Sequence, residues 1–350
     1  MVIYPLSSEV LPAIYKFRSS APLLQHLQIS GPWCDGMARL PDDFLGRHAP
    51  SLRYLRLEGS TPLMLKPFPL PNLTDLTLFV AEPRVPTRAI YGLLSSAPRL
   101  RNVSITVMHE AMEETPIPDI HLGSLRCLNL TMVSGSTLSR VIPHIKAPKL
   151  EELALGMSLR MGVTTITDLL PPESYPLITE VTSMGFRGIS DESRVTEITF
   201  KGKGTNVSLS TYFPRPTALR DFFADTAPFL FAQITRLELK FEAGSLASRI
   251  TEFENLERIE LEQCTGEDVI LEALCPSPGS VPWVPCPHLE VMQLVPCSPR
   301  RLTLENLVRM ARSRKEAGCS LERIDIPSFL SEGEKEMLNE SLGKDSVLGL

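Results

Sequence analysis

The sequence predicts an α/β fold, in which short parallel strands alternate with helices and loops and stack into an irregular repeat solenoid. Three observations predict it: a short apolar phrase recurs along the 350 residues, a proline often precedes it at a fixed offset, and helix-like segments separate the copies. Apolar residues make up 43% of the chain, which is enough for the extensive core that a stacked array buries.

The recurring phrase is Pro-x-Leu-x-x-Leu-x-Leu, with other large apolar residues sometimes replacing leucine. Because side chains alternate along a strand, the last two apolar positions point to one side and form a core row. The five intervals between Leu24 and Leu150 are 21 to 28 residues long, as in leucine-rich repeats, and later intervals are more irregular. Six copies carry the proline (Pro22, Pro50, Pro71, Pro98, Pro148 and Pro287), and five lack it (Leu125–Leu130, Val195–Phe200, Ile234–Leu239, Leu256–Leu261 and Leu321–Ile326).

Segments with helical periodicity lie between many of these copies. The clearest is Leu304–Ala317, where Leu304, Leu307, Val308 and Ala311 share one face. Strand and helix therefore alternate, which favours a parallel sheet lining a concave side and helices or loops on the convex side. The other expected helices are Arg88–Leu94, Thr137–Ile145, Leu219–Phe231, Leu246–Phe253 and Asp268–Leu274.

We expect a single leucine-rich-repeat array of about 11–12 irregular repeats over residues 1–350. Residues 171–216 depart from the pattern, because two β-like runs there, Val195–Phe200 and Val207–Leu209, flank a glycine-rich turn. The sequence therefore predicts a hairpin-like insertion over 171–216. This insertion leaves open whether the array is continuous or split.

Composition narrows the functional classes. The net charge of −6 gives no electrostatic footprint for nucleic acid. Seven cysteines without a CxxC pair predict a reducing, intracellular location, cytoplasmic or nuclear, and neither a signal peptide nor a membrane-length apolar run is visible. Cys264 and Cys297 occupy the Asn/Cys position of the repeat, where a side chain turns inward and satisfies loop backbone.

No enzymatic constellation is visible in the sequence. Lys201–Thr205 lacks the spacing of a phosphate-binding loop, and we interpret it as a turn. Cys264, Cys275, Cys286 and Cys297 are spaced too widely for a typical zinc site, and no histidine stands in a catalytic motif. We therefore expect no catalytic residues, no metal and no cofactor.

The candidate site is a surface instead. On each strand, the residues between the core positions face the concave side, where solenoids commonly bind partners. The alternative is that this is simply a solvated sheet face. The residues expected to bind a protein partner are Tyr54, Arg56, Asp75, Asn102, Asn129, Glu152, Arg236, Glu238, Lys240, Arg258, Glu260 and Arg323.

Three phrases suggest a family: His48-Ala-Pro-Ser-Leu-Arg-Tyr-Leu-Arg-Leu, Leu70-Pro-Asn-Leu-Thr-Asp-Leu-Thr-Leu and Leu93-Leu-Ser-Ser-Ala-Pro-Arg-Leu-Arg-Asn-Val. With them the chain resembles the leucine-rich-repeat region of fungal, mushroom-type F-box proteins, best from Pro22 to Phe241. The resemblance implies a substrate-recognition role beside a Skp-type adaptor and a cullin. This sequence shows no F-box motif ahead of the repeats and an incomplete first repeat, so the adaptor is expected only if an F-box is encoded upstream.

The sequence thus predicts a non-enzymatic protein-binding module that resembles the substrate receptor of an F-box ubiquitin ligase. The alternative is a free-standing leucine-rich-repeat scaffold or regulator without a ubiquitin link. We expect no nucleic acid and no membrane among the partners.

Overall fold

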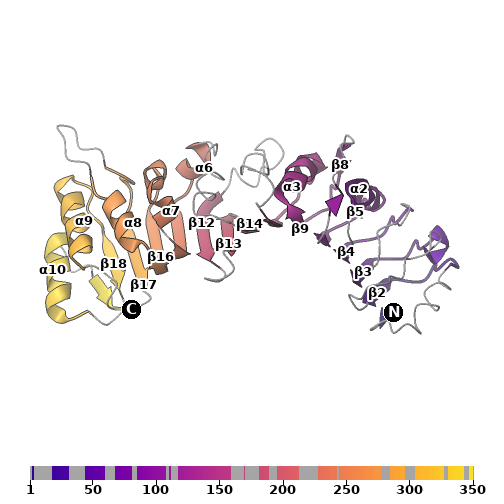
Figure 1. Cartoon of the computed structure of the whole chain (residues 1–350), viewed down its shortest axis with the longest axis horizontal. Helices are drawn as coiled ribbons and strands as arrows, with labels where there is room; N and C mark the ends of the chain where they lie inside the picture. The colour runs from indigo at the N-terminus through magenta and orange to yellow at the C-terminus, as the bar shows by residue number, and fades with distance from the viewer. Residues whose placement is uncertain are drawn as a thin grey trace. The chain divides into compact units, whose positions relative to one another are not determined.

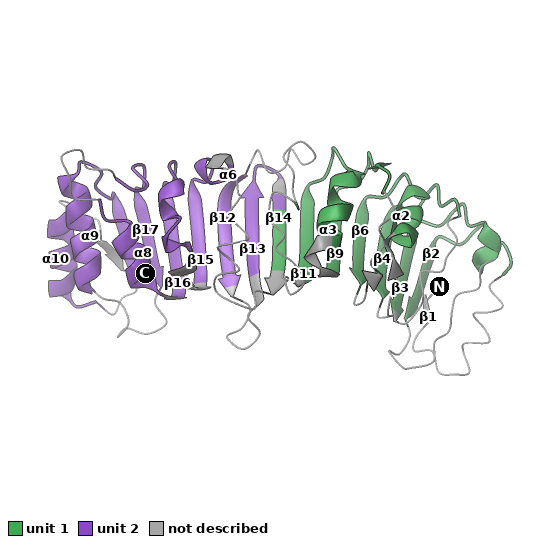
Figure 2. Cartoon of the chain, turned by 45° about the horizontal axis from the view of Figure 1, so that its top comes forward, with its two compact units in different colours: residues 1–177, 207–211 green, residues 178–206, 212–350 purple. Residues whose placement is uncertain are grey.

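The computed structural model divides the chain into two compact units, which we describe separately (Figure 2). Unit 1 consists of Met1–Leu177 and Val207–Thr211, and unit 2 of Ile178–Asn206 and Tyr212–Leu350. The structure describes residues 2–3, 18–30, 44–59, 68–80, 85–107, 110–111, 117–158, 169, 181–188, 195–212, 228–242, 244–276, 284–295, 304–326, 330–342 and 347–349.

Unit 1 contains a sheet whose strands follow one another in chain order, as consecutive repeats require. Each strand from β1 to β11 pairs in parallel with its neighbour, and the core rows align, so that Leu55 is in register with Leu27 and Leu76. Leu27, Leu55 and Leu76 are each 1% exposed. The strands are β1 (Val2–Ile3), β2 (His26–Ser30), β3 (Tyr54–Gly59), β4 (Asp75–Val80), β6 (Asn102–Val107), β9 (Cys127–Ser134), β11 (Glu152–Ser158) and β14 (Thr205–Tyr212).

Short helices cover the other side of the unit 1 strands (Figure 1). The Tyr91 hydroxyl of α2 donates a 2.6 Å hydrogen bond to the carbonyl oxygen of Val141 in α3 and so joins these two helices. The pKa of the Tyr91 phenol is raised, mainly by burial. The elements on this side are η1 (Phe44–Arg47), α2 (Thr87–Ser95), α3 (Gly135–Val141), η2 (Ile142–His144) and two parallel strand pairs, β5 (Val85–Pro86) with β7 (Glu110–Ala111) and β8 (Ile120–His121) with β10 (Ile145–Lys146).

Unit 2 repeats this pattern after one antiparallel pair. Strands β12 and β13 pair antiparallel. Strand β15 pairs in parallel with β12, and each strand from β16 to β19 pairs in parallel with the strand before it. The strands are β12 (Val181–Gly188), β13 (Val195–Gly202), β15 (Arg236–Glu242), β16 (Arg258–Thr265), β17 (Val291–Val295), β18 (Arg323–Ile326) and β19 (Val347–Gly349), and the helices are α6 (Pro228–Ala232), α7 (Gly244–Ala247), η5 (Ile250–Glu252), α8 (Glu267–Ala273), α9 (Leu304–Glu316) and α10 (Glu332–Leu342).

A tight turn before each strand explains the recurrent proline. In the copy that starts at Pro71, the amide of Leu73 donates to the carbonyl oxygen of Leu70, and Leu73 is fully buried beneath the turn. Proline suits such a turn because its backbone angle is already set and its missing amide is not needed there. The Asn72 side chain also donates a 2.7 Å hydrogen bond to the carbonyl oxygen of Pro50, so successive turns are joined.

These observations confirm the predicted α/β class and most of the predicted elements. The helix predicted over Leu304–Ala317 spans Leu304–Glu316. Of the helix predicted over Leu219–Phe231, the part before Pro228 lies outside the described residues. Helix α10 and the short strand pairs on the helical side were not predicted. The runs Val195–Phe200 and Val207–Leu209 are both strands, and the repeat number and the insertion boundaries stay predictions.

The inward role predicted for the Asn/Cys position is confirmed at Cys264. This side chain is buried, and its Sγ donates a 3.0 Å hydrogen bond to the carbonyl oxygen of Leu239 on the neighbouring strand. The thiol therefore satisfies backbone of the adjacent repeat, as the position requires. Cys297 lies outside the described residues.

The close approach of β12 and β13 requires glycine at position 185. Gly185 pairs with Thr199, and a Cβ at position 185 would lie 2.6 Å from Thr199 Oγ1, whereas its next neighbour, Glu238 Cβ, is 3.8 Å away. We expect Gly185→Ala to destabilise unit 2 by about 1–3 kcal/mol in urea unfolding, because the two side chains overlap. In a Thr199→Ala background the same change should cost almost nothing. An equal cost in both backgrounds would show that the overlap is not the cause.

Candidate functional site

The candidate site is the strand face, by which we mean the side chains on the strands that point away from the core. On unit 1 it consists of rows that cross the strands, because the parallel register aligns equivalent repeat positions. One row is His26, Tyr54, Asp75, Asn102, Cys127 and Glu152, and the next is Gln28, Arg56, Thr77, Ser104, Asn129 and Ala154.

Hydrogen bonds on unit 1 organise the first strands of this face. Arg56 Nε donates a 2.8 Å hydrogen bond to Glu58 Oε1, and Ser30 Oγ donates one of 2.8 Å to Glu58 Oε2. The hydrogen bond between Arg56 and Glu58 is the main cause of both pKa shifts at this pair. It lowers the pKa of Glu58 and raises the pKa of Arg56. Glu58 is therefore held as a carboxylate, and it extends the predicted site by one residue.

Further along unit 1 the face is mild and polar. Asn102 Nδ2 donates a 2.6 Å hydrogen bond to Asp75 Oδ1, while the Thr74 hydroxyl lies 2.6 Å from Asp75 Oδ2. Asn129 is exposed and has no side-chain hydrogen bond within the described part of the chain. Ser104 lies beside it on the neighbouring strand. This part of the face can donate to and accept from a partner without first breaking an ion pair.

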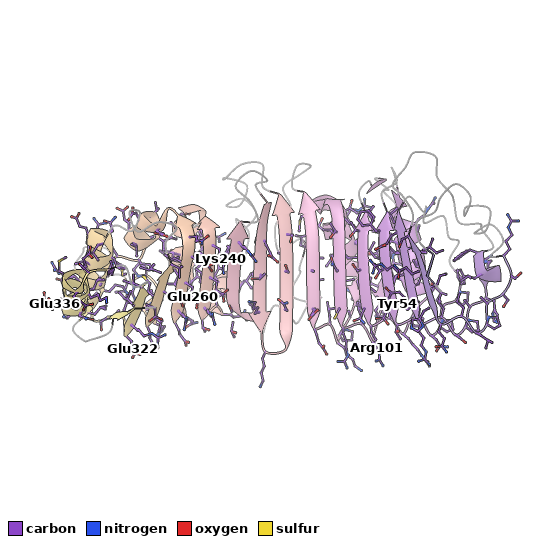
Figure 3. All side chains as sticks on the ribbon, turned by 90° about the horizontal axis from the view of Figure 1, so that it is seen from below. Tyr54, Arg101, Lys240, Glu260, Glu322 and Glu336 are labelled. Carbon is purple, nitrogen blue, oxygen red and sulfur yellow. The ribbon has the colours of Figure 1, made fainter. Side chains whose placement is uncertain are left out.

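On unit 2 the strand face carries two rows of opposite charge. The first consists of Arg236, Arg258, Val291 and Arg323, and the second, two residues further along each strand, of Glu238, Glu260, Gln293 and Asp325. Figure 3 shows Glu260 and Lys240 on this face. Lys240 also forms an ion pair with Glu262 on the next strand.

These two rows neutralise each other. Glu260 Oε1 accepts hydrogen bonds from Arg236 Nη2 at 2.9 Å and from Arg258 Nε at 2.8 Å. Arg258 Nη2 also donates a 2.8 Å hydrogen bond to Gln293 Oε1. Arg323 Nη2 lies 3.0 Å from Asp325 Oδ2, and Asp325 is buried. The charges of unit 2 are thus arranged to bind one another first, and a partner would compete with that network.

The structure brings the twelve predicted site residues together as two sets, one on each unit. None of the twelve is buried, and their role in binding a partner stays a prediction. Sequence reasoning did not identify the residues just before each strand, which form a further row at the edge of the sheet. Aligning the copies on their leading apolar residue would have revealed this row, since it stands at a fixed offset.

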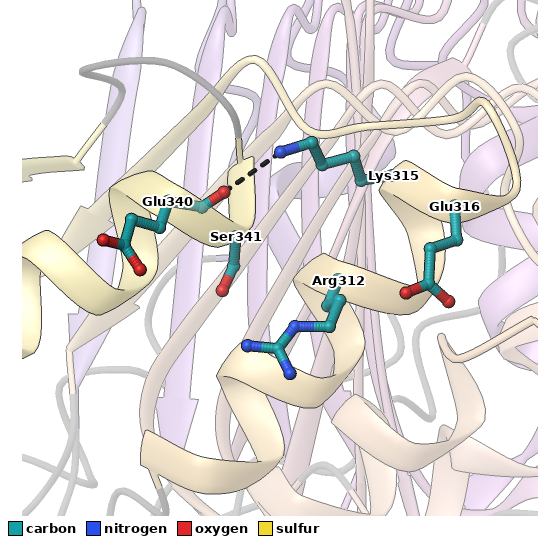
Figure 4. A pocket seen from close by; sticks show the side chains of 5 residues that line it. All are labelled: Arg312, Lys315, Glu316, Glu340 and Ser341. Atoms are coloured by element: carbon teal, nitrogen blue, oxygen red, sulfur yellow. Dashed lines mark hydrogen bonds between the residues drawn. The ribbon is translucent and has the colours of Figure 1, made fainter.

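Neither a metal site nor a membrane helix is found within the described ranges. They contain no group of three or more His, Cys, Asp or Glu side chains placed to hold a metal ion. None of their helices is long and apolar enough to cross a membrane. A cavity of about 480 Å³ lies beside α9 and α10, where Lys315 Nζ donates a 3.0 Å hydrogen bond to the carbonyl oxygen of Glu340 (Figure 4). Its lining residues are Arg312, Lys315, Glu316, Glu340 and Ser341, and the Ser341 hydroxyl donates a 2.8 Å hydrogen bond to the carbonyl oxygen of Met337.

Comparison with known proteins yields one family. The family described as "FBD-associated F-box protein At5g56370, LRR repeats" matches residues 18–215, which is more than half of the chain. No curated protein matches the chain. The matched range covers β2 to β11, where the strands follow one another most regularly, together with β12 to β14.

Proposed function

Because the chain belongs to the leucine-rich-repeat family of FBD-associated F-box proteins, we propose that it is a non-enzymatic module that binds a protein partner across its strand face. In the fuller form of this proposal, it recognises the substrate of an F-box ubiquitin ligase in an intracellular compartment. The similarity to mushroom-type F-box proteins in particular remains a prediction from the sequence.

One observation supports the binding role most directly. Parallel strands in register present rows of unburied polar side chains, while the leucine, valine and isoleucine side chains of the core rows on the same strands are almost completely buried. Repeat proteins use such extended arrays to contact a partner over many strands at once. The central part of the unit 1 face, around Ser104 and Asn129, has the fewest internal charge pairs, so we place the main contact there.

A free-standing scaffold without a ubiquitin link is the second candidate. Both candidates use the same face, and they differ only in whether a Skp-type adaptor and a cullin belong to the complex. Affinity purification of the complete gene product separates them, because recovery of both proteins supports the ligase form. Recovery of a substrate-like partner without either protein supports the scaffold.

We expect the double substitution Ser104→Arg and Asn129→Arg to weaken partner binding strongly. Two long charged side chains on adjacent strands would hold a docked surface away from the sheet, and losing one good contact region weakens binding by about tenfold or more. The measurement is quantitative mass spectrometry of proteins captured by the tagged chain. Ser95→Arg at the exposed end of α2, on the helical side, is the control and should leave capture unchanged. If the double variant captures the partner as well as the Ser95→Arg control does, binding through this face is excluded.

A further inference from the structure

A row of basic side chains lines the edge of unit 1 where the strands begin. Arg53, Arg101 and Arg126 come immediately before β3, β6 and β9, and Arg99 and Lys149 lie in the turns before β6 and β11. All five are exposed. We call these five residues the strand-start patch, and Figure 3 shows Arg101 near the edge of the sheet while Tyr54 lies further along a strand.

The backbone holds this patch in a regular spacing. The Arg101 amide donates a 2.8 Å hydrogen bond to the Thr74 carbonyl oxygen, and the Arg126 amide donates one of 2.8 Å to the Arg101 carbonyl oxygen. The Glu151 amide continues the ladder with a 2.8 Å hydrogen bond to the Arg126 carbonyl oxygen. Neighbouring strands are about 4.8 Å apart, so the residues from Arg53 to Arg126 span three strand spacings, or roughly 14 Å.

Most of the positive charge in this patch is uncompensated. Arg126 forms an ion pair with Glu151 at 3.0 Å, with both side chains more than half exposed. Arg99 Nη1 donates a 2.8 Å hydrogen bond to the amide oxygen of Asn72, which is neutral and does not compensate the positive charge of Arg99. Within the described part of the chain, Arg53, Arg101 and Lys149 have no ion-pair partner. In a protein of net charge −6, such a concentration of cations is a local reversal of sign.

The fold itself does not require arginine at this position. In unit 2 the same position, immediately before β16, β17 and β18, is occupied by Glu257, Glu290 and Glu322, and the same amide ladder connects them. These glutamates are exposed as well. Because either sign of charge is compatible with the ladder, the backbone hydrogen bonds do not account for the arginines of unit 1.

We propose that the strand-start patch binds an acidic segment of the protein partner, in an extended conformation that runs across the starts of β3 to β9. The inference rests on the proposed function and names the chemistry of the partner. Arginine guanidinium groups bind carboxylates through paired hydrogen bonds, and an extended chain advances about 3.4 Å per residue, so four or five residues cover the stretch from Arg53 to Arg126.

An acidic peptide fits this surface better than nucleic acid does. A duplex or single strand is a long polyanion that needs an extended basic surface, and its binding is opposed by the net negative charge of the whole chain. Asp75 and Glu151, which lie among the arginines, would repel a continuous phosphate backbone. A short peptide with a few spaced carboxylates avoids them.

The test uses the full chain and a fluorescein-labelled twelve-residue peptide of alternating glutamate and serine. We expect saturable binding that weakens at higher salt, and we expect Arg53→Glu with Arg101→Glu to weaken it at least about tenfold. The matched control is Arg309→Glu with Arg312→Glu, which changes the net charge equally at exposed positions of α9 and should leave binding unchanged. A thermal melt checks that both variants remain folded.

Two results would overturn the proposal. One is peptide binding that is equal in the wild-type chain and in the variant with both arginines reversed. The other is tighter binding of a single-stranded oligonucleotide of the same length. If the cellular partner is lost with Ser104→Arg and Asn129→Arg but captured normally with both arginines reversed, only the strand-start proposal fails. If neither variant affects capture, the proposed function fails as well.

Discussion

Replacing Arg314 with alanine should destabilise unit 2 by about 3–5 kcal/mol, because it leaves several buried carbonyl groups without a donor. Arg314 lies on α9, and its side chain is fully buried. Its Nη1 donates a 2.7 Å hydrogen bond to the carbonyl oxygen of Pro285, and its Nη2 donates one of 2.9 Å to that of Cys286. One guanidinium thus holds α9 against the turn that leads into β17.

The burial of Arg314 is unusual, because no carboxylate in the described residues pairs with it and its Nε has no hydrogen-bond partner. Burial is the main cause of two pKa shifts here. It lowers the pKa of the Arg314 guanidinium, and it raises the pKa of the neighbouring Cys286 thiol to about 12. Within the described residues, the hydrogen bonds of this guanidinium therefore all go to backbone carbonyl oxygens. Lysine cannot reach two carbonyls with a planar fork, so we expect Arg314→Lys to recover only part of the lost stability.

The measurement for Arg314 is urea unfolding combined with hydrogen exchange of α8, α9 and β17. The control is Arg309→Ala, which removes an exposed arginine from the same helix and should change stability by no more than about 0.5 kcal/mol. If Arg314→Ala costs no more than Arg309→Ala, the carbonyl contacts do not stabilise the unit.

The strands could be predicted from the sequence because the apolar phrase encodes both the period and the buried side. Leu55, Leu76 and Leu128 occupy the same position of the phrase, and each is buried in the row that the phrase predicts. The residues that face away from the core could be predicted for the same reason, since a strand that buries one side must present the other. Helix α10 was not predicted because few of its residues are apolar. Its buried residues lie near its end, around Leu338 and Leu342.

Interactions that depend on neighbouring repeats could not be predicted in the same way. The contacts of Glu260 with both Arg236 and Arg258 require the exact register of β15 and β16, which the apolar pattern alone does not determine. Arg314 was equally hidden, because an arginine in an amphipathic helix normally faces water and only the packed turn before β17 shows otherwise. The phrase thus predicts which side of each strand is buried, whereas the charge networks depend on contacts between repeats.

Replacing Phe231 with alanine is the second change for which we expect a large effect, about 3–5 kcal/mol of lost stability. Phe231 in α6 is fully buried, and its ring centroid lies 4.6 Å from that of Phe253 in a tilted arrangement. The guanidinium carbon of Arg249 lies 4.9 Å from the centre of the Phe231 ring. Alanine would leave a cavity under α6 and remove both ring contacts.

Because each repeat contacts mainly its neighbours, this loss should remain local. Hydrogen exchange should accelerate in α6, η5, β15 and β16 and stay unchanged in β2 to β4 of unit 1. Phe231→Leu, which refills most of the volume, should recover more than half of the stability, and a double-mutant cycle with Arg249→Ala should show a coupling of about 0.5–1 kcal/mol. Faster exchange throughout both units would instead mean that the chain unfolds as one cooperative body, and the repeat-by-repeat description of its stability would then be wrong.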